Sequence, residues 1–475
     1  MKTMRISVLA VFIVLLAWVM THAAGCLAAA TGANKPPAAS KAEPQIPPQI
    51  QEQWLGDLPG PANVIVRSAT TNGCHLAWVE PRGSQAVVVV DCREGLAYDS
   101  IESGTLMFSP DGRQVAYVAG KGVKHFAVIN DQPGTEYDDI VKDTLTFSPD
   151  GKHLAYAAHK GNLQFVVVDS QMEPAYDRIG KEPVSFSPDG KRVAYVAAKD
   201  GRWFVVVDGK AGPAYGGIGK ATIIFSPDGK RLAYVAAKAD KWFVVVDGNA
   251  GPQYDRIGTP VFSPDGKRLA YAPERNSKRF VVVDGNAGPE YDRVGTPVFS
   301  PDGKRLAYAA EENGKRFAVV DGQAAPAYDG IAKLVFSPDG RHLAYGARKG
   351  NKWFVIVDGK AQPEYDVFLE GTLTFSPDGK RLAYGAGIAD KRFVVVDGAP
   401  GRELQGILGA LIFSPDSKHL AYGAAGKEAW YFVVTDGQSG PWYDGISSGP
   451  VFLKDGTLEY ITSKIDSLYR VNYKP

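Results

Sequence analysis

One short motif, Phe-Ser-Pro-Asp-Gly, recurs along this chain at a nearly constant interval. Its Phe stands at positions 108, 147, 186, 225, 262, 299, 336 and 375, with an altered copy at 413 and a degraded copy at 452. Successive copies are 37 to 39 residues apart, and a fixed period of about 20–50 residues indicates a repeat architecture. Residues shared by all copies are therefore expected to build the repeat, and functional residues are expected where the copies differ.

The copy around Phe225 predicts four short strands joined by tight turns. An apolar run at 223–226 leads into Pro-Asp-Gly, whose backbone preferences suit a turn. Further strands are predicted at 231–237 and 242–246, and a short fourth strand, Tyr-Asp-Arg-Ile, at 254–257. The third strand is apolar without alternation, which indicates burial on both faces. A four-stranded unit covered on both faces by its neighbours is a β-propeller blade.

About eleven such units can be counted. Residues 72–78 and 86–91 match the second and third strands of a first unit that lacks the Phe motif. The last unit, from Val451, has no fourth strand of its own, and the segment around Trp54 is a candidate to supply it. We therefore predict an all-β fold, a β-propeller of about eleven four-stranded blades.

Two arrangements of these blades stay open. Propellers typically have about 4–8 blades, so two rings of about five and six would fit that range. No linker interrupts the array, however, and pairing the two ends of the chain would close a single ring and remove its open edges. One large ring is therefore the preferred arrangement, and two rings are the alternative.

The repeat also resembles a known family. The unit Phe-Ser-Pro-Asp-Gly-Lys-Arg-Leu-Ala-Tyr, followed by an apolar strand that ends in Asp, is similar to the WD40-like propeller repeat of TolB-type bacterial proteins. The resemblance covers about residues 62–475, although the family pattern does not require the Tyr-Asp-x-Ile segment found here. It implies an exported bacterial protein with protein partners, which fold analogy alone does not name.

Residues 1–30 have the composition of an export signal. Two basic residues precede an unbroken apolar run at 6–20, which is short for a membrane span and typical of a signal core. Two cleavage patterns stay open. The sequence Ala-Ala-Gly-Cys ending at Cys26 resembles a bacterial lipoprotein box, in which the cysteine receives a lipid, whereas the three alanines ending at Ala30 fit ordinary signal peptidase cleavage.

Residues 31–60 are rich in Pro, Ala, Lys and Gln and predict a semi-extended tether, and residues 61–475 form the predicted propeller. This organisation predicts a protein of the bacterial periplasm, or one anchored to the envelope through a lipid on Cys26. Contact with a membrane is expected only through that anchor.

Two further cysteines lie in the first unit. Cys74 opens its second strand and Cys92 follows its third strand. Folding this hairpin about Gly83 places positions 74 and 92 opposite each other, within disulfide range for antiparallel strands. Export would place both thiols in an oxidising compartment. We therefore predict a disulfide between Cys74 and Cys92.

The histidines and most aspartates follow the repeat, so a structural role is predicted for them. Four histidines occupy a position that carries Arg or Gln in other units, namely His75, His153, His342 and His419. His125 replaces Arg or Trp before a third-strand Phe, and His159 stands in a loop without a visible Asp or Ser partner. The Asp of each Ser-Pro-Asp is expected to bond the amides of its own turn. No sequence motif indicates a catalytic residue, a metal site or a cofactor.

The loops between second and third strands do differ among units, and they should project from one rim. Loops on a rigid scaffold are the usual place for binding. The candidate binding residues on this rim are Lys121, His159, Lys160, Glu274, Arg275, Glu311, Glu312, Asp390, Lys427 and Glu428.

The charge of the chain is balanced, with 53 basic and 52 acidic side chains, which gives no case for nucleic acid. We predict a monomeric cell-envelope scaffold that binds a protein or glycan without catalysis. The alternative is a propeller enzyme, a carbohydrate lyase or hydrolase, acting at the central channel. That alternative requires charged residues on the inner strands, where Phe452-Leu453-Lys454 is the main deviation from the repeat.

Overall fold

The computed structural model describes residues 50–57, 66–70, 72–426 and 430–475. All of them belong to one compact unit, Gln45–Pro475. The predicted export signal, Cys26, Lys427 and Glu428 lie outside the described residues. The stretch predicted as a tether ends in a β-strand, β1 (Ile50–Asp57), so the folded part begins before the expected boundary at residue 61.

The unit around Phe225 shows how one blade is built. Its strands β22 (Ile224–Phe225), β23 (Leu232–Lys238), β24 (Lys241–Val246) and β25 (Asn249–Ala250) pair antiparallel in chain order. The second and third strands agree closely with the prediction from the sequence.

The predicted fourth strand at 254–257 is instead divided between two blades. Tyr254 bridges back to Trp242 of its own unit. The next two residues, β26 (Arg256–Ile257), pair with β29 (Pro273–Arg275) of the following unit. The Tyr-Asp-x-Ile segment therefore carries the chain from the outer edge of one blade to the first strand of the next.

The first strands are short or bulged. They are β2 (Val66–Thr70), β6 (Ser100–Ile101) with β7 (Met107–Phe108), β11 (Asp139–Ile140) with β12 (Thr146–Phe147), β16 (Arg178–Ile179) with β17 (Ser185–Phe186), β21 (Gly217–Ile218) with β22, β26 with β27 (Val261–Phe262), β33 (Arg293–Val294) with β34 (Val298–Phe299), β38 (Gly330–Phe336), β42 (Val367–Phe375), β46 (Gly406–Phe413) and β50 (Gly445–Phe452).

The second strands are the most buried, and most of them run without interruption. They are β3 (Gly73–Arg82), β8 (Val115–Lys121), β13 (Leu154–Lys160), β18 (Val193–Lys199), β23, β28 (Leu269–Tyr271) with β29, β35 (Leu306–Glu312), β39 (Leu343–Lys349), β43 (Leu382–Ile388), β47 (Leu420–Ala425) and β51 (Leu458–Lys464).

The third strands are β4 (Gln85–Val90), β9 (Lys124–Ile129), β14 (Leu163–Val168), β19 (Arg202–Val207), β24, β30 (Lys278–Arg279) with β31 (Val282–Val283), β36 (Lys315–Val320), β40 (Lys352–Val357), β44 (Lys391–Val396), β48 (Tyr431–Thr435) and β52 (Ser467–Tyr473). The fourth strands are β5 (Arg93–Tyr98), β10 (Gln132–Pro133), β15 (Gln171–Met172), β20 (Lys210–Ala211), β25, β32 (Asn286–Ala287), β37 (Gln323–Ala324), β41 (Lys360–Ala361), β45 (Ala399–Pro400), β49 (Gln438–Ser439) and β1.

These strands form twelve hydrogen-bonded sheets within the described residues. Two of the sheets, β26-β29-β30 and β27-β28-β31-β32, share the repeat unit around Phe262, so the twelve sheets correspond to the eleven units of the sequence. The architecture is all-β, as predicted, and each complete sheet has four or five antiparallel strands.

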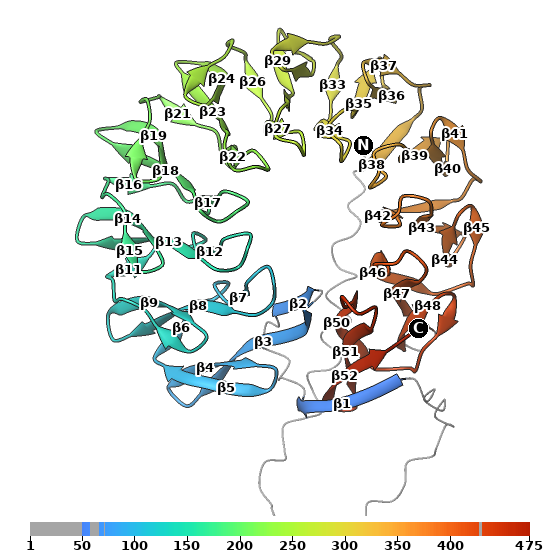
Figure 1. The fold of residues 1–475 in the computed structure, drawn as a ribbon, viewed down its shortest axis with the longest axis horizontal. Helices are drawn as coiled ribbons and strands as arrows, with labels where there is room; N and C mark the ends of the chain where they lie inside the picture. Colours follow the sequence, from blue (N-terminus) through green and yellow to red (C-terminus); the bar gives the residue numbers. More distant parts are fainter. Residues whose placement is uncertain (1–49, 58–65, 71, 427–429) are drawn as a thin grey trace, which may run out of the picture. The chain divides into compact units, whose positions relative to one another are not determined.

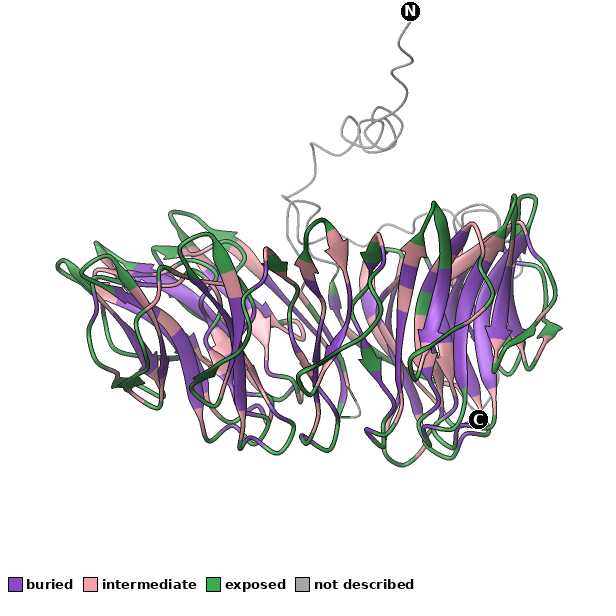
Figure 2. Cartoon of the chain, turned by 90° about the horizontal axis from the view of Figure 1, so that it is seen from above, coloured by how far each residue is buried: buried purple, intermediate pink, exposed green. Residues whose placement is uncertain are grey.

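Strand β1 closes the array by pairing with β52 from Ile50↔Tyr473 to Asp57↔Ser467. The sheet β1-β52-β51-β50 therefore joins both ends of the chain, which confirms the predicted completion of the last unit. Strand β50 in turn contacts β2 and β3 of the first unit. The sheets follow one another in chain order around a common centre (Figure 1), and in Figure 2 their buried strands span the distance between two exposed edges.

The core lies between neighbouring sheets. In one such layer, Val235 and Val244 of one blade pack with Phe262 and Phe280 of the next. Tyr254 lies between them, with its ring centroid 5.9 Å from that of Phe280 in an edge-on arrangement, a geometry that aromatic pairs favour. Because each blade buries its faces only against its two neighbours, stability depends on an unbroken series of contacts.

Candidate functional site

Each blade has two ends that differ in composition. The pairing of Phe225 with Leu232 sets the Ser-Pro-Asp-Gly turn at one end, together with the Asp-Gly turn after the third strand. The pairing of Lys238 with Lys241 sets the turn between second and third strands at the opposite end. We call these two ends the turn face and the loop face.

On the turn face, the Ser and Asp of the motif hold their own turn together. Ser187 Oγ donates a hydrogen bond to Asp189 Oδ1 at 2.6 Å, and the backbone amide of Lys191 donates to the same oxygen at 3.3 Å. The backbone amide of Arg192 donates to Ser187 Oγ at 2.9 Å. The bond from Ser187 is the main cause that lowers the pKa of the Asp189 carboxyl. The predicted turn role of these aspartates is confirmed.

The Asp that ends each third strand fastens the second strand beside it. Asp247 has a left-handed backbone, and its Oδ1 accepts the backbone amide of Leu232 at 2.9 Å. Its Oδ2 accepts Nε of Arg231 at 3.1 Å. The same guanidinium then crosses to the next blade, where its Nη1 donates to the carbonyl of Lys267 at 3.1 Å. In the units that carry this arginine, it and the aspartate therefore join the blade to the next one.

Four units place a histidine where this arginine stands. Nδ1 of His75 lies 2.7 Å from Asp91 Oδ2, and Nδ1 of His342 lies 2.6 Å from Asp358 Oδ2. His153 and His419 contact Asp169 and Asp436 in the same way. The structural role predicted for these histidines is confirmed. Unlike the arginine, these imidazoles form no hydrogen bond with a described residue of the next blade, and His75 meets that blade through its ring, whose centroid lies 6.0 Å from that of Phe108.

On the loop face, a second aspartate joins successive blades. Oδ2 of Asp255 accepts the backbone amide of Asn276 in the loop of the following unit at 2.9 Å, and its Oδ1 accepts Nζ of Lys241 at 2.5 Å. Asp292 contacts Asn313 and Lys278 in the same way. This role was not predicted from the sequence, although Asp follows Tyr in most units and that recurrence was the available signal.

The candidate rim residues do lie at the loop face where they are described. Lys121, Lys160, Glu312 and Asp390 are exposed at the ends of second strands or in the adjoining turns. Three others are held in ion pairs with side chains of the same blade, namely Glu274 with Arg279 at 3.0 Å, Arg275 with Glu290 at 2.9 Å and Glu311 with Arg316 at 2.8 Å. The exposed residues are therefore the ones best placed to meet a partner.

His159 is not the lone side chain that the sequence suggested. Its Nε2 lies 3.5 Å from Asp139 Oδ2, and Nδ1 of His125, from the preceding blade, lies 3.8 Å from Asp139 Oδ1. Asp139 is brought there by β11, the two-residue strand that crosses between blades. This contact could not be predicted from the sequence pattern, because the contact depends on which neighbouring strand β11 pairs with.

Among the described residues, the predicted disulfide does not form, and Cys74 and Cys92 are both free. Ala77 pairs with Val90, a register that places residue 93, not 92, opposite position 74. Strand β4 ends at Val90, and the positive φ of Cys92 turns its side chain toward β1. A Cβ at Gly56 of β1 would lie 2.7 Å from Cys92 Sγ, so glycine is needed at that point.

A charged cluster joins the closing sheet to the first blade. Glu459, whose side chain is 9% exposed, accepts the backbone amide of Cys74 at 2.6 Å. Arg470 donates to the carbonyl of Cys74 at 3.0 Å and lies 3.8 Å from both Glu459 and Asp91. These residues come from the two units that meet at the ends of the chain, so they fix the closure.

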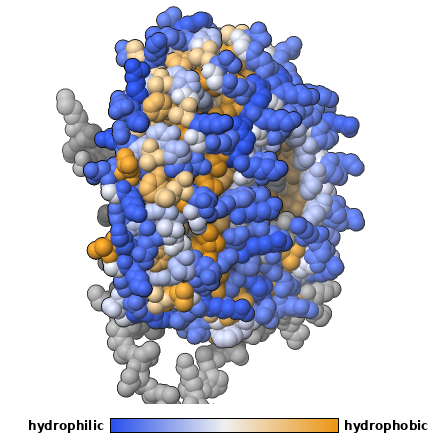
Figure 3. Space-filling view, turned by 60° about the vertical axis from the view of Figure 1, so that its left-hand side comes forward, coloured by the Kyte–Doolittle hydropathy of each residue, from blue (hydrophilic) through white to orange (hydrophobic). Residues whose placement is uncertain are grey.

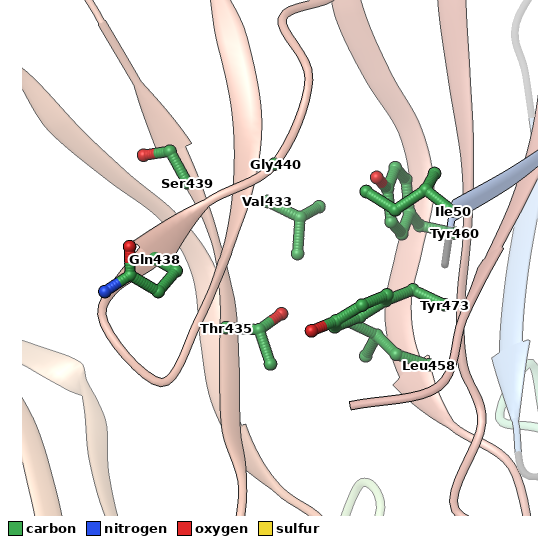
Figure 4. A pocket seen from close by; sticks show the side chains of 9 residues that line it. All are labelled: Ile50, Val433, Thr435, Gln438, Ser439, Gly440, Leu458, Tyr460 and Tyr473. Atoms are coloured by element: carbon green, nitrogen blue, oxygen red, sulfur yellow. The ribbon is translucent and has the colours of Figure 1, made fainter. Parts of the chain in front are cut away.

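Four cavities lined by described residues lie between adjacent blades. One of about 100 Å³ separates the tenth unit from the closing sheet, where Ile50, Tyr460 and Tyr473 face Val433 and Thr435 (Figure 4). Larger grooves of about 630, 350 and 250 Å³ open on the turn face. On the side seen in Figure 3, hydrophilic side chains form the outline, and hydrophobic surface lies in patches between them.

Within the described part of the chain, no group of three or more His, Cys, Asp or Glu residues is placed to hold a metal ion. The same residues include no helix long and apolar enough to cross a membrane.

A scan against protein-family models and a search of curated proteins gave no match. Solved structures do match. A eukaryotic initiation factor is 14% identical with a TM-score of 0.43, and the match covers 86% of this chain and 98% of that one. The Dos1 propeller is 13% identical with a TM-score of 0.32, covering 61% and 90%. The β-propeller domain of the Trilobed protease from Pyrococcus furiosus is 14% identical with a TM-score of 0.28, covering 56% and 96%.

The repeated four-stranded sheets, packed face to face and closed by a strand from each end of the chain, define a β-propeller protein.

Proposed function

We propose that this chain is an exported bacterial propeller of the TolB-like type that binds an envelope protein or glycan through its loop face, without catalysis. The observation that carries the proposal is that shared and differing side chains occupy different places in the blade. The residues shared by the repeat bond to one another, as Asp247 does with Arg231 and Leu232. The residues that differ from unit to unit, such as Glu312 and Asp390, are exposed on the loop face.

Such an arrangement suits a binding scaffold. A rigid ring presents a series of loops in a fixed order, and their differing charges make each sector of the loop face distinct. Electrostatic complementarity between these loops and a partner would set specificity and orientation. Export is supported by the apolar run at 6–20 of the sequence, and the periplasm or a lipid anchor on Cys26 is the proposed location.

Site-directed photo-crosslinking in intact bacterial envelopes tests the loop face. A photoreactive amino acid at Lys121 or Asp390 is expected to capture a discrete partner, identified by mass spectrometry. The matched controls are Lys230 and Lys267, which are as exposed but lie on the turn face. Equal capture from both faces, or turnover of glycans or peptides by the purified protein, would overturn the proposal.

The export step has its own measurement. The mass of the mature N-terminus, determined on protein isolated from its natural host, distinguishes a lipidated Cys26 from a chain that begins after Ala30. A chain that retains Met1 in the cytoplasm would contradict the proposed location.

A further inference from the structure

The turn-face junctions between blades differ in one side chain, which is arginine at five junctions, histidine at four and glutamine at one, where Gln114 donates to the carbonyl of Gly151 at 3.1 Å. At five junctions an arginine fills the space between its own blade and the next; these are Arg192, Arg231, Arg268, Arg305 and Arg381. In each, Nε donates to the third-strand Asp at 3.0 to 3.2 Å. The guanidinium carbon lies 5.2 to 5.4 Å from the centroid of the next blade's Phe ring.

The arginine is held by a third set of contacts as well. In the Arg268 junction, Nη1 donates to the carbonyl oxygens of Gly303 and Lys304 in the next turn, at 3.3 and 2.9 Å. A carboxylate, two carbonyl oxygens and an aromatic face thus form a cradle shaped for one planar cation. Guanidinium is suited to such a cradle because it carries five donors in one plane and stacks on aromatic rings.

At His342, where histidine replaces the arginine, the cradle is open. The groove of about 350 Å³ beside His342 is lined by the corresponding carboxylate, ring and turn, namely Asp358, Phe375, Gly379 and Lys380. The imidazole binds Asp358, as the arginine would, but no described side chain donates to the carbonyl oxygen of Gly379 or Lys380. The grooves of about 630 and 250 Å³ likewise lie beside His75 and His419.

We propose that the groove beside His342 binds the guanidinium group of an arginine side chain presented by a partner protein. The bound group would stack on Phe375 and donate to the carbonyls of Gly379 and Lys380, as the chain's own arginines do elsewhere. Nearby cations do not oppose this placement, because Arg192 occupies its cradle with Lys210 and Lys230 at the positions of Lys360 and Lys380.

An arginine is favoured over a lysine for a geometric reason. The ammonium group of lysine is a compact point charge that cannot span two carbonyls while stacking on a ring. The inference concerns the turn face and does not rest on the proposed binding at the loop face, so each can fail without the other.

The test uses the purified full chain and a short peptide that carries one arginine beside a photoreactive residue. Labelling is expected within residues 375–380, mapped by mass spectrometry, and N-acetyl-arginine amide should compete for it. A peptide with citrulline in place of arginine keeps the shape without the charge and should label at least about tenfold less, a ratio worth about 1.4 kcal/mol. A lysine peptide should also label less.

Two reciprocal substitutions make the test specific. His342→Arg reproduces the filled junctions and should abolish labelling at 375–380, whereas Arg268→His reproduces the open ones and should create labelling at 299–304. Thermal denaturation of both variants verifies that they fold. Labelling that persists in His342→Arg, equal labelling by the citrulline peptide, or stronger competition by free arginine than by the amide would overturn the proposal.

Discussion

The phenolic hydroxyl of Tyr443 donates a hydrogen bond to Glu52 Oε1 at 2.6 Å, across 391 positions of sequence. Tyr443 belongs to the outer edge of the tenth unit, and Glu52 lies on β1, the strand that completes the closing sheet. Burial is the main cause that raises the pKa of this phenol far above its usual range. The contact therefore couples the N-terminal strand to the blade before the closure.

Removing this hydroxyl should weaken the closure. We expect Tyr443→Phe to lower the free energy of unfolding by about 1.5–3 kcal/mol, because it removes a hydrogen bond to a carboxylate and leaves Glu52 without its phenol. The measurement is chemical denaturation followed by fluorescence.

The chain offers a matched control in Tyr195, a buried tyrosine whose hydroxyl has no hydrogen-bond partner among the residues that the structure describes. Tyr195→Phe should be neutral or slightly stabilising, since it removes a buried polar group that nothing satisfies. An equal decrease in the free energy of unfolding of the two variants would show that the hydrogen bond from Tyr443 to Glu52 does not stabilise the closure.

The pairing of β1 with β52 predicts that the N-terminal strand is essential to the fold. Removing residues 1–57 should expose the edge of β52, lower the denaturation midpoint and promote association through that edge. Removing only residues 1–44, which leaves β1 in place, should do neither. In averaged electron micrographs, the chain that lacks only residues 1–44 is expected to form a single ring. Images of two separate rings would contradict the contacts of β50 with β2 and β3.

The sequence predicted the regular part of each blade well and its junctions poorly. The second and third strands carry long apolar runs, so β23 and β24 lie within one residue of their predicted bounds. The segment around Tyr254 is too short to show which neighbour it pairs with, and it pairs with both. Completion of the last blade by the N-terminal segment was predictable because the last unit visibly lacked a strand.

The candidate sites divide in the same way. The turn role of Asp189 follows from a local motif and was predictable, whereas the contact of His159 with Asp139 depends on pairing between blades. The cysteine prediction failed because a shift of one residue in register changes which side chains meet. The open groove beside His342 was invisible in the sequence, since a histidine at a repeat position says nothing about the volume it leaves.

The two cysteines should behave as unequal free thiols. Burial is the main cause that raises the pKa of Cys74 to about 12, and it also raises the pKa of the half-exposed Cys92. In a chain carrying Cys26→Ser, at about pH 8, Cys92 should react slowly with a thiol reagent and Cys74 should not react until the protein unfolds, because the thiolate is the reactive form. Two free thiols should be counted after unfolding without reductant. A count of zero would show that Cys74 and Cys92 form a disulfide.

The repeated tyrosines of the second strands predict an alkaline limit to stability. Burial is the main cause that raises the pKa of Tyr308, Tyr345 and Tyr422 to about 12, above the ordinary pKa of about 10 for a tyrosine. The unfolded chain releases these protons near pH 10 and the folded chain does not. The stability that each phenol contributes is therefore fully present below about pH 10 and is lost as pH rises from about 10 to 12, by up to about 2–3 kcal/mol per residue. Denaturation midpoints at pH 8, 10 and 11, read with phenolate absorbance, should fall steeply above about pH 10. A chain in which Tyr308, Tyr345 and Tyr422 are all Phe should show a shallower fall, and an unchanged slope would exclude these phenols as its cause.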